Sequence, residues 1–414
     1  MIKNYSASAL IYTLIVLVII TVIISSLIMY FHYENLYYQR MVMQNRMQDN
    51  VISGFDLVGE NPDIVSYGQS IEFNLYDDPL DVIHISREQW GLFDLVSIFA
   101  SHQNDTVMKS ALMGDFLARN DSLALYLPGK GYPLKICGDS RVEGFCYLPK
   151  SGIRGVSVEG RYYSNDTILH GISQISEQQL PQFTKELKVQ QFIDDVFSSS
   201  TSAEEYNVSD PNSSKLTNEY HQPIKILYSS ESICIENVEM KGKILLVSDQ
   251  SVLIRNTAKL NGIIVYAPQI EIESGFTGSL QVFCKHLISI QENVTLEYPS
   301  LLYCSNPNQD EEYVINIGSQ SLIAGAVIAT ASEKGVFMDT DSHVYGQVYS
   351  NGNFYHKGSV YGQVYCDLLY YQSLSSIYKN LMMDSEINRS FLPPEYVGIE
   401  LVNNSETYYL MQWL

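Results

Sequence analysis

The chain opens with an uninterrupted apolar run close to its N-terminus. The residues from Ala9 to Met29 carry no charge over 21 positions. At 1.5 Å per residue, a helix of this length spans about 30 Å, the thickness of a membrane's hydrocarbon core. The run ends in Tyr30 without the small-residue cleavage site of a secretory signal peptide. The pattern therefore predicts an uncleaved transmembrane helix at residues 9–29 after a stub at residues 1–8, in preference to a cleaved signal or a buried core helix.

The charges around this run indicate its orientation. Lys3 and the terminal amine precede the span, and the next basic residues are Arg40 and Arg46. Positive charge is retained on the cytoplasmic side of a membrane. We therefore expect a single-pass protein of the cell inner membrane, with a cytoplasmic N-terminus and a periplasmic or extracellular bulk.

Helical periodicity continues beyond the apolar run. No Pro or Gly occurs from Tyr30 to Ser53. Apolar residues recur there three, four or seven positions apart: Leu36, Met43, Met47 and Val51. This pattern predicts an amphipathic extension of the same helix, which ends at a C-cap near Gly54.

Period-two alternation replaces the helical pattern between Ser66 and Leu127. Short apolar segments alternate with acidic turns, as expected for strands. The segments are residues 71–75, 82–85, 90–100, 112–117 and 123–127. They predict a small sheet packed on the helix, in a domain at residues 30–130.

A repeat dominates the remaining sequence. The six residues Val344–Tyr349 recur 16 positions later as Val360–Tyr365. A looser unit, apolar-x-Gly-x-apolar, has copies at Gly242, Gly262, Gly278, Gly325, Gly346 and Gly362. An earlier pair of Val-Glu-Gly sequences begins at Val142 and Val158. A period of about 16 to 20 residues favours one solenoid coil per repeat.

The repeat therefore predicts a single-stranded β-helix at residues 131–366, with an antiparallel meander as the alternative. In a β-helix, Val348 and Val364 occupy equivalent inward positions on adjacent coils. Tyr349 and Tyr365 then point the other way, because successive side chains alternate along a strand.

Two segments interrupt or follow the repeat. Residues 177–225 form an insertion, with a predicted helix from Glu177 to Ser198 and a polar loop after it. The tail at residues 367–414 predicts a helix from Leu368 to Met382 and a last strand ending in Trp413. The expected fold is thus mainly β, with an N-terminal helix.

Composition narrows the classes of partner. The formal net charge of −21 argues against nucleic acid and against adsorption on anionic lipid. Six Cys residues permit disulfides in an exported domain. Cys137 and Cys146 are the best candidate pair, and buried free thiols are the alternative.

No catalytic motif occurs in the sequence. Asp339 and Asp341 form the best carboxylate pair; they could bind Ca²⁺ or act on a sugar, but a charged turn between coils is favoured. His343 and His356 fit solvent-facing turns better than metal ligands. We therefore expect no catalytic residue, no cofactor and no metal site.

Tyrosines recur within the repeat. Four of the 31 tyrosines would stack in register on successive coils: Tyr345, Tyr349, Tyr361 and Tyr365. Such a ladder stabilises a sheet surface, and it can also hold a sugar ring or a protein partner. Structure is the favoured role.

The N-terminal region resembles minor pilins and pseudopilins of type IV pilus-like and type II secretion-like systems. The resemblance rests on the short basic start Met1–Ser6, the small-residue entry Ala7-Ser-Ala9, and the helix that leads into a small sheet. The chain departs from that family in lacking a Gly before the apolar run and a glutamate within it. The repeats resemble β-helical and bactofilin-like solenoids by pattern.

The resemblance implies a non-enzymatic, membrane-anchored envelope protein that belongs to a filament or secretion assembly. Its expected partners are the membrane and other pilin-like subunits, and the solenoid could also meet cell-envelope polysaccharide. An anchored carbohydrate-binding or carbohydrate-active β-helix is the main alternative. A plain envelope scaffold is a third.

Overall fold

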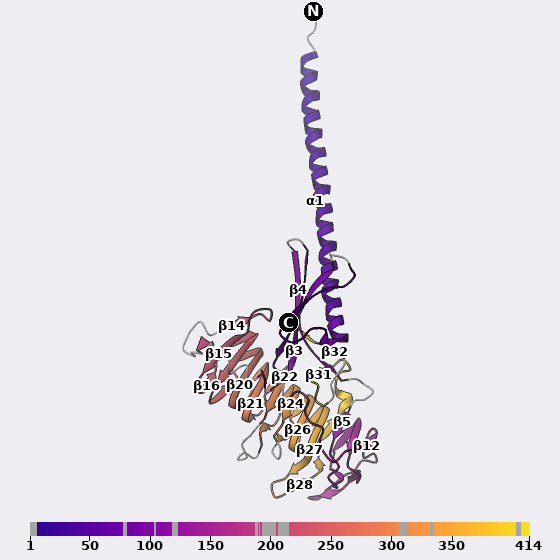
Figure 1. Ribbon diagram of the computed structural model, residues 1–414, viewed down its shortest axis with the longest axis vertical. Coiled ribbons are helices and arrows are strands. Elements are labelled where there is room, and N and C mark those ends of the chain that lie inside the picture. The colour runs from indigo at the N-terminus through magenta and orange to yellow at the C-terminus, as the bar shows by residue number, and fades with distance from the viewer. Residues whose placement is uncertain are drawn as a thin grey trace, which may run out of the picture.

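The protein is a long helix that leads into a sheet and then into a β-solenoid (Figure 1). The computed structural model describes residues 6–77, 81–102, 105–117, 123–186, 189, 191–192, 204–205, 215–305, 313–331, 335–402 and 407–414. The predicted stub at residues 1–8 lies largely outside these ranges. The helix projects from one side of the head formed by the sheet and the solenoid.

Helix α1 (Ser6–Glu60) is continuous and about 80 Å long at 1.5 Å per residue. Its most apolar window has a mean hydropathy of 2.9 and no buried residue, so it is long and apolar enough to cross a membrane. The predicted helix end near Gly54 is wrong. Gly54 lies inside the helix, where a Cβ would stand 2.6 Å from Cδ1 of Ile83. The absent side chain lets the helix approach the sheet.

The packed face of α1 begins later than the periodicity predicts. Met47 and Val51 are buried and Met43 is half-buried, but Leu36 is 48% exposed. The sheet reaches up the helix only as far as Arg40, whose Nε donates to Oδ2 of Asp105 at 2.8 Å. Above that point, apolar side chains of the helix have no cover within the described chain.

The sheet next to α1 is antiparallel and six-stranded. A short 3₁₀ turn (η1, Pro62–Ile64) joins it to the helix. Its strands are β1 (Gln69–Asn74), β2 (Val82–Trp90), β3 (Phe93–His102), β4 (Asp105–Phe116), β31 (Val397–Gly398) and β32 (Tyr408–Trp413). The predicted single strand at residues 90–100 is divided by a turn at Gly91, where φ is +64°. The predicted last strand ending in Trp413 is confirmed, and it joins this sheet.

The two faces of the sheet contact different partners, as the alternation of β3 shows. Val96 and Ile98 pack against α1, in one apolar cluster with Met47 and Val51. Leu95, directly before Val96, packs on the opposite side against outward-facing residues of the solenoid. The sheet is therefore a middle layer between the helix and the solenoid.

The solenoid has about ten turns. Its strands pair in parallel with the strand one coil away, except at the β28 hairpin. They are β5 (Leu123–Tyr126), β7 (Arg141–Glu143), β8 (Phe145–Leu148), β12 (Ser173–Ile175), β13 (Glu204–Glu205), β14 (Lys215–Asn218), β15 (Lys225–Ser229), β16 (Ile233–Ile235), β17 (Glu239–Gly242), β18 (Ile244–Ser248), β19 (Ser251–Ile254), β20 (Lys259–Ile272), β21 (Thr277–Ile290), β22 (Thr295–Cys304), β23 (Ile315–Ile317), β24 (Leu322–Ala329), β25 (Val336–Met338), β26 (His343–His356), β27 (Ser359–Gln372), β28 (Ile377–Lys379) and β30 (Glu386–Asn388).

Small strands and a turn decorate the solenoid. They are β6 (Leu134–Cys137), β9 (Ile153–Gly155) and β29 (Leu381–Met383) in one three-stranded sheet, the hairpin β10 (Ser157–Val158) with β11 (Arg161–Tyr162), and η4 (Arg389–Phe391). The predicted equivalence of Val142 and Val158 is wrong. Val142 is buried in the solenoid core, whereas Val158 belongs to the separate hairpin.

The predicted β-helix is confirmed at its strongest repeat. Val348 pairs with Val364 on parallel strands, and both side chains are buried in the solenoid core. Tyr349 and Tyr365 point out of that core and pack under other segments. The antiparallel meander is thereby excluded for these coils.

The repeat glycines are not all equivalent. Gly325, Gly346 and Gly362 form one row, each beside the glycine of the next coil. Gly278 instead lies opposite Leu296, in the row that also contains Ile323. The predicted copy of the unit at Gly278 is therefore not structurally equivalent to the last three copies, because bulges shift the register of β21.

The solenoid strands that come first in the sequence lie at one end of the stack, next to the strands that come last in the sequence. β5 pairs with β27, β7 pairs with β30, and β12 pairs with β8 at the end of the stack. The opposite end holds β14, β15 and β16, as Figure 1 shows. Strand pairing therefore extends the solenoid from Leu123 to Asn388, beyond the predicted limits of 131 and 366, and takes Leu123–Tyr126 out of the predicted small sheet.

The segment after β12 returns along the outside of the stack. The amide of Glu177 donates to the Tyr126 hydroxyl at 3.3 Å, and the Tyr349 hydroxyl donates to the carbonyl of Pro181 at 3.0 Å. Farther along, the ring centroid of Phe192 lies 5.5 Å from that of Phe283. We call the described residues from Ser176 to Glu186 the strap.

The predicted helix from Glu177 to Ser198 is not formed over its first part. Glu177 to Lys185 is irregular or turn-like, and Pro181 lies at its centre. Proline lacks an N–H and opposes a helix interior. Beyond this stretch, most of the predicted helix lies outside the described residues, as does most of the predicted polar loop.

The predicted tail helix from Leu368 to Met382 is wrong. β27 extends to Gln372, and β28 and β29 follow it. Leu369 faces the solenoid core and Tyr370 pairs with Tyr355 of the preceding coil. The apolar residues of this segment have helical spacing, but the segment forms a strand because its backbone pairs with the strand of the preceding coil.

Candidate functional site

The predicted carboxylate pair lies in a turn. Asp339 and Asp341 follow β25, and Asp341 has a φ of +57°. Oδ1 of Asp339 accepts a bond from the Thr340 amide at 2.8 Å, which is a local turn contact. This geometry fits the favoured charged turn. Within the described residues, no group of three or more His, Cys, Asp or Glu could hold a metal ion.

The prediction for the two histidines is wrong for His356. Its side chain is fully buried beside Phe354, and neither ring nitrogen has a hydrogen-bond partner among the described residues. Burial lowers the pKa of His356 to about 3, so the ring is neutral. His343 is half-buried and stacks on Tyr361.

The tyrosine ladder forms as predicted. Tyr345 and Tyr361 have ring centroids 4.8 Å apart, and Tyr349 and Tyr365 have centroids 6.4 Å apart. Tyr349 is only 2% exposed, because Phe183 of the strap covers it at 5.7 Å. This half of the ladder therefore packs the head and offers no ring face to a ligand.

The candidate disulfide between Cys137 and Cys146 is absent, and none of the six cysteines forms a disulfide. Cys146 is buried in the solenoid core, whereas Cys137 packs in a satellite cluster with Leu381. Burial raises the pKa of the Cys146 thiol to about 12. The alternative of small buried residues describes both.

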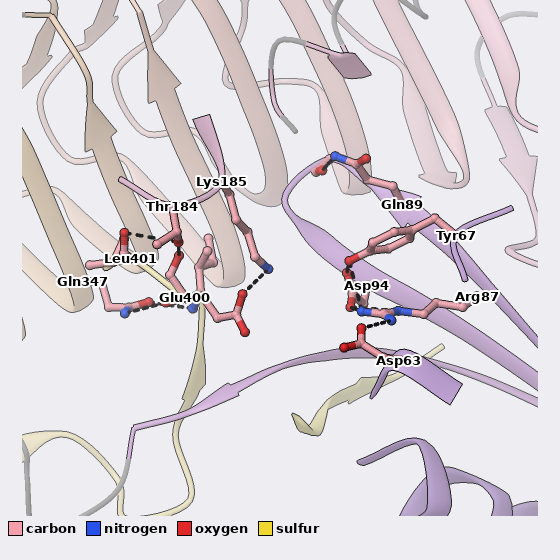
Figure 2. Close-up of polar contacts among 12 residues, drawn as sticks. Asp63, Tyr67, Arg87, Gln89, Asp94, Thr184, Lys185, Gln347, Glu400 and Leu401 are labelled. Carbon is pink, nitrogen blue, oxygen red and sulfur yellow. Dashed lines mark hydrogen bonds and ion pairs between the residues drawn. The ribbon is translucent and has the colours of Figure 1, made fainter. Parts of the chain in front are cut away.

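Two buried ion pairs lie where sheet, strap and solenoid meet (Figure 2). Nη2 of Arg87 lies 2.6 Å from Oδ2 of Asp94, inside the sheet. Nζ of Lys185, on the strap, lies 3.7 Å from Oε2 of Glu400. Both cations lie close to the ring of Tyr408, at 5.5 and 5.6 Å from its centroid. Because two positive and two negative groups balance, the buried junction carries no net formal charge.

Tyr67 completes the sheet side of this junction. Its hydroxyl donates to Oδ1 of Asp94 at 2.6 Å, and its ring lies 4.3 Å from the guanidinium carbon of Arg87. Burial raises the pKa of Tyr67 well above its ordinary value. These groups are fully engaged with one another, so the cluster orients the layers.

Two solenoid glutamines hold the backbone of the sheet. Gln281 accepts from the Leu92 amide at 3.1 Å and donates to the Trp90 carbonyl at 2.9 Å. Gln347 accepts from the Ile399 amide at 2.7 Å and donates to its carbonyl at 2.9 Å. Sequence reasoning missed both glutamines. The only signal was for Gln347, because a Gln recurs directly after the repeat glycine at Gln347 and Gln363.

A groove lies between the sheet and the solenoid coils at the end that holds β14. Its volume is about 890 Å³. It is lined by Met108, Lys109, Ser110, Thr217, Asn218, Glu219, Tyr220, His221, Lys241, Gly242, Asn261, Gln412, Trp413 and Leu414. Trp413 is 46% exposed at its rim, and Nζ of Lys109 lies 5.0 Å from the Trp413 ring centroid.

A second uncovered surface is the part of α1 between the apolar run and the sheet. We call residues 30–42 the helical spacer. Eight of its 13 residues are large, apolar or aromatic, and exposed. They are Tyr30, Phe31, Tyr33, Leu36, Tyr37, Tyr38, Met41 and Val42.

The fold and these surfaces define an N-terminal apolar helix joined to a β-solenoid head. Searches with this chain found no matching family model, no curated relative and no solved structure of similar fold.

Proposed function

We propose that this protein is a non-enzymatic, membrane-anchored structural component of an envelope assembly, similar in its N-terminal architecture to minor pilins and pseudopilins. The anchor is residues 9–29, with the N-terminus in the cytoplasm and the head in the periplasm or outside the cell. The sheet that packs on α1 corresponds to the small pilin-like domain of that architecture. The head supplies a large folded surface at the end of the helix.

The helical spacer carries the proposal. A hydrocarbon core accommodates about 30 Å of helix, which residues 9–29 already fill. The spacer adds 13 residues, or about 20 Å, before the sheet covers the helix. Aromatic residues of the first turn suit the membrane interface, but Leu36, Tyr38 and Val42 lie beyond it. Exposed apolar surface of this kind marks a protein interaction site.

The placement of the spacer side chains favours neighbouring helices as partners. At about 100° per residue, Phe31 and Tyr38 lie roughly 140–160° around the helix from Gly54, which faces the sheet. A helix that packs on Phe31 and Tyr38 therefore approaches from the side opposite the head. The polar residues Asn35 and Gln39 form a narrower stripe between these two sides.

The test compares two double variants in native membranes. We expect Tyr38→Lys with Val42→Lys, at about 160° and about 120° around the helix from Gly54, to release the protein from a large detergent-extracted assembly into a monomer-sized fraction in sedimentation velocity. Asn35→Lys with Gln39→Lys adds the same charge on the polar stripe and should leave the assembly intact. A wild-type protein that sediments as a monomer, or equal behaviour of both variants, contradicts the proposal.

A reporter that is active only outside the cytoplasm tests the orientation. It should work when fused after Ser66 and fail when fused before Ala9. The reverse pattern refutes the proposed localisation.

Carbohydrate binding or cleavage by the head is the second candidate. Asp339 and Asp341 offer little support for cleavage, because their turn places Asp341 in the left-handed region and engages Asp339 with its own backbone. We expect Asp339→Asn with Asp341→Asn to leave the cellular phenotype unchanged. Polysaccharide cleavage by the protein that is lost in this double variant would establish the enzyme instead.

A further inference from the structure

The edge of β4 is covered over only part of its length. β32 pairs with β4 from Asp115 to Ala111, and the amide of Leu414 donates to the Ser110 carbonyl at 3.0 Å. Along an antiparallel strand, the N–H and C=O of every second residue point to the same side. The backbone groups of Met108 therefore point to the same side as those of Ser110. No strand of the described chain pairs with Met108 on that side.

The groove reaches this open edge, because Met108 and Leu414, which follows the last paired residue of β32, both line it. Met108, Lys109 and Ser110 form one wall, and Lys241 and Asn261 of the solenoid lie on the other. A strand needs about 4.8 Å beside its partner and rises about 3.4 Å per residue. The volume of about 890 Å³ accommodates an extended segment of about five residues, in line with β32.

The walls supply side-chain contacts on both faces of such a segment. Met108 and its cross-strand neighbour Phe99 are 41% and 36% exposed, and they form an apolar surface beside the edge. Lys109 and Lys241 have no ion-pair partner within 4 Å among the described residues. Lys109 lies opposite Ile98 and so projects on the α1 side of β4, whereas Lys241 lines the groove from the solenoid. In a chain of net charge −21, a lysine without an ion pair on each side of the open edge favours a ligand that carries carboxylates. Glu219 lines the same groove and offsets part of this positive charge.

We propose that the groove receives an extended acidic segment of a partner protein, which adds to the sheet as a strand antiparallel to β4. The segment exchanges backbone hydrogen bonds with Met108, places an apolar side chain on Met108 and Phe99, and directs the next side chain, a carboxylate, to the opposite face toward Lys109. This is strand addition at an exposed sheet edge, where backbone bonds give affinity and the alternate side chains give selectivity. The inference does not depend on assembly through the helical spacer.

The probe is a blocked seven-residue peptide in which valine alternates with threonine and aspartate, titrated into the full chain in detergent micelles. Trp413 reports binding, since it is the exposed one of the two tryptophans and Trp90 is buried. We expect saturable binding that shifts the Trp413 emission. The same peptide with lysine in place of aspartate should bind about tenfold more weakly at low salt, and the difference should shrink as salt rises.

Met108→Pro tests the backbone contact directly. Proline removes the outward N–H of Met108 and leaves the bonds between β3 and β4, since proline is tolerated where the N–H of an edge strand faces outward. We expect about tenfold weaker binding for Met108→Pro and none of this loss for Met108→Leu. Lys109→Gln should weaken the binding of the acidic peptide about threefold and should not weaken the binding of the lysine peptide.

Three results would overturn the proposal. They are the absence of saturable binding up to millimolar peptide, equal affinities of Met108→Pro and Met108→Leu, and no selectivity for the acidic peptide at low salt. Binding of a polysaccharide fragment that quenches Trp413 and is unaffected by Met108→Pro would assign the groove to sugars instead.

Discussion

Val348 and Val364 occupy the same inward position on adjacent coils, with their strands parallel and in register. Both side chains are buried in a continuous apolar core that extends through the solenoid. Each coil buries its apolar stripe only through its neighbours, so the stability of one coil depends on the coils beside it.

Val348→Asp should unfold the head. The new carboxylate would lie in a dry stripe without a partner, which costs several kcal/mol. Thr340→Asp adds the same charge to an exposed turn of the same coil and should change stability by less than about 0.5 kcal/mol. Urea denaturation followed by circular dichroism measures both. A cooperative transition of near-native midpoint for Val348→Asp would refute the core assignment.

Gly346→Ala should also destabilise the head, by about 2 kcal/mol or more. A Cβ at Gly346 would stand 2.0 Å from the carbonyl oxygen of Gly325 on the preceding coil, and φ is +142°. Backbone cannot yield as a flexible side chain does, so the coils must separate.

Gly160→Ala is the matched control. Gly160 has a φ of +80° but nothing within 4 Å of its Cβ position, so this variant reports the cost of the left-handed backbone alone. Thermal unfolding of the two variants separates the clash from the strain. Equal losses would show that close approach of the coils is not the reason for the glycine row.

His356 should make the head less stable in acid. Burial lowers the folded pKa of His356 to about 3, against about 6.5 in an unfolded chain. Below about pH 6.5 the His356 ring binds a proton in the unfolded state but stays neutral in the folded state. Stability is therefore lost as pH falls from 6.5 toward 3, at about 1.4 kcal/mol per pH unit from this residue.

His356→Met should remove this contribution and raise stability at pH 7 by about 1–3 kcal/mol, because two unsatisfied ring nitrogens leave the core. Met338 lies opposite His356 on the preceding coil, which indicates that the site accepts methionine. Urea midpoints between pH 4 and pH 8 give the slope for both proteins. An unchanged slope in the variant would show that another group titrates.

Lys185→Met should weaken the attachment of the strap and lower the free energy of unfolding by about 3 kcal/mol. It leaves the buried carboxylate of Glu400 without its cation, and removing one partner of a buried pair costs more than the pair contributes. Lys185→Met with Glu400→Leu should recover most of the loss. Guanidinium denaturation measures all three variants, and a double variant no more stable than Lys185→Met would contradict the role of the pair.

Local periodicity was sufficient to predict the elements that bond within their own segment or pair with a copy of the same repeat. The apolar run and its continuation predict α1, because each helical residue bonds within its own segment. The sixteen-residue repeat predicts the pairing of Val348 with Val364, since identical coils stack in register. The tyrosine ladder follows from the same repeat.

The sequence could not predict contacts between unlike segments. No sequence pattern near Leu125 indicates that it pairs with Val364, more than two hundred residues away. The order of the coils in the stack could therefore not be predicted. The same holds for Gln347, whose side chain bonds the backbone of Ile399. Such contacts depend on the complete stack.

The amino-acid pattern by itself determined the apolar helix, the sheet strands next to it and the parallel coils of the repeat. Only the tertiary structure decided that β5 closes the far end of the solenoid, that the segment around Leu369 is a strand, and that His356 is buried. The physical reason is that hydrogen bonds within a helix and contacts between repeated coils are encoded in local spacing. Burial and pairing at the ends of the stack depend on segments that are distant in sequence and carry no shared period.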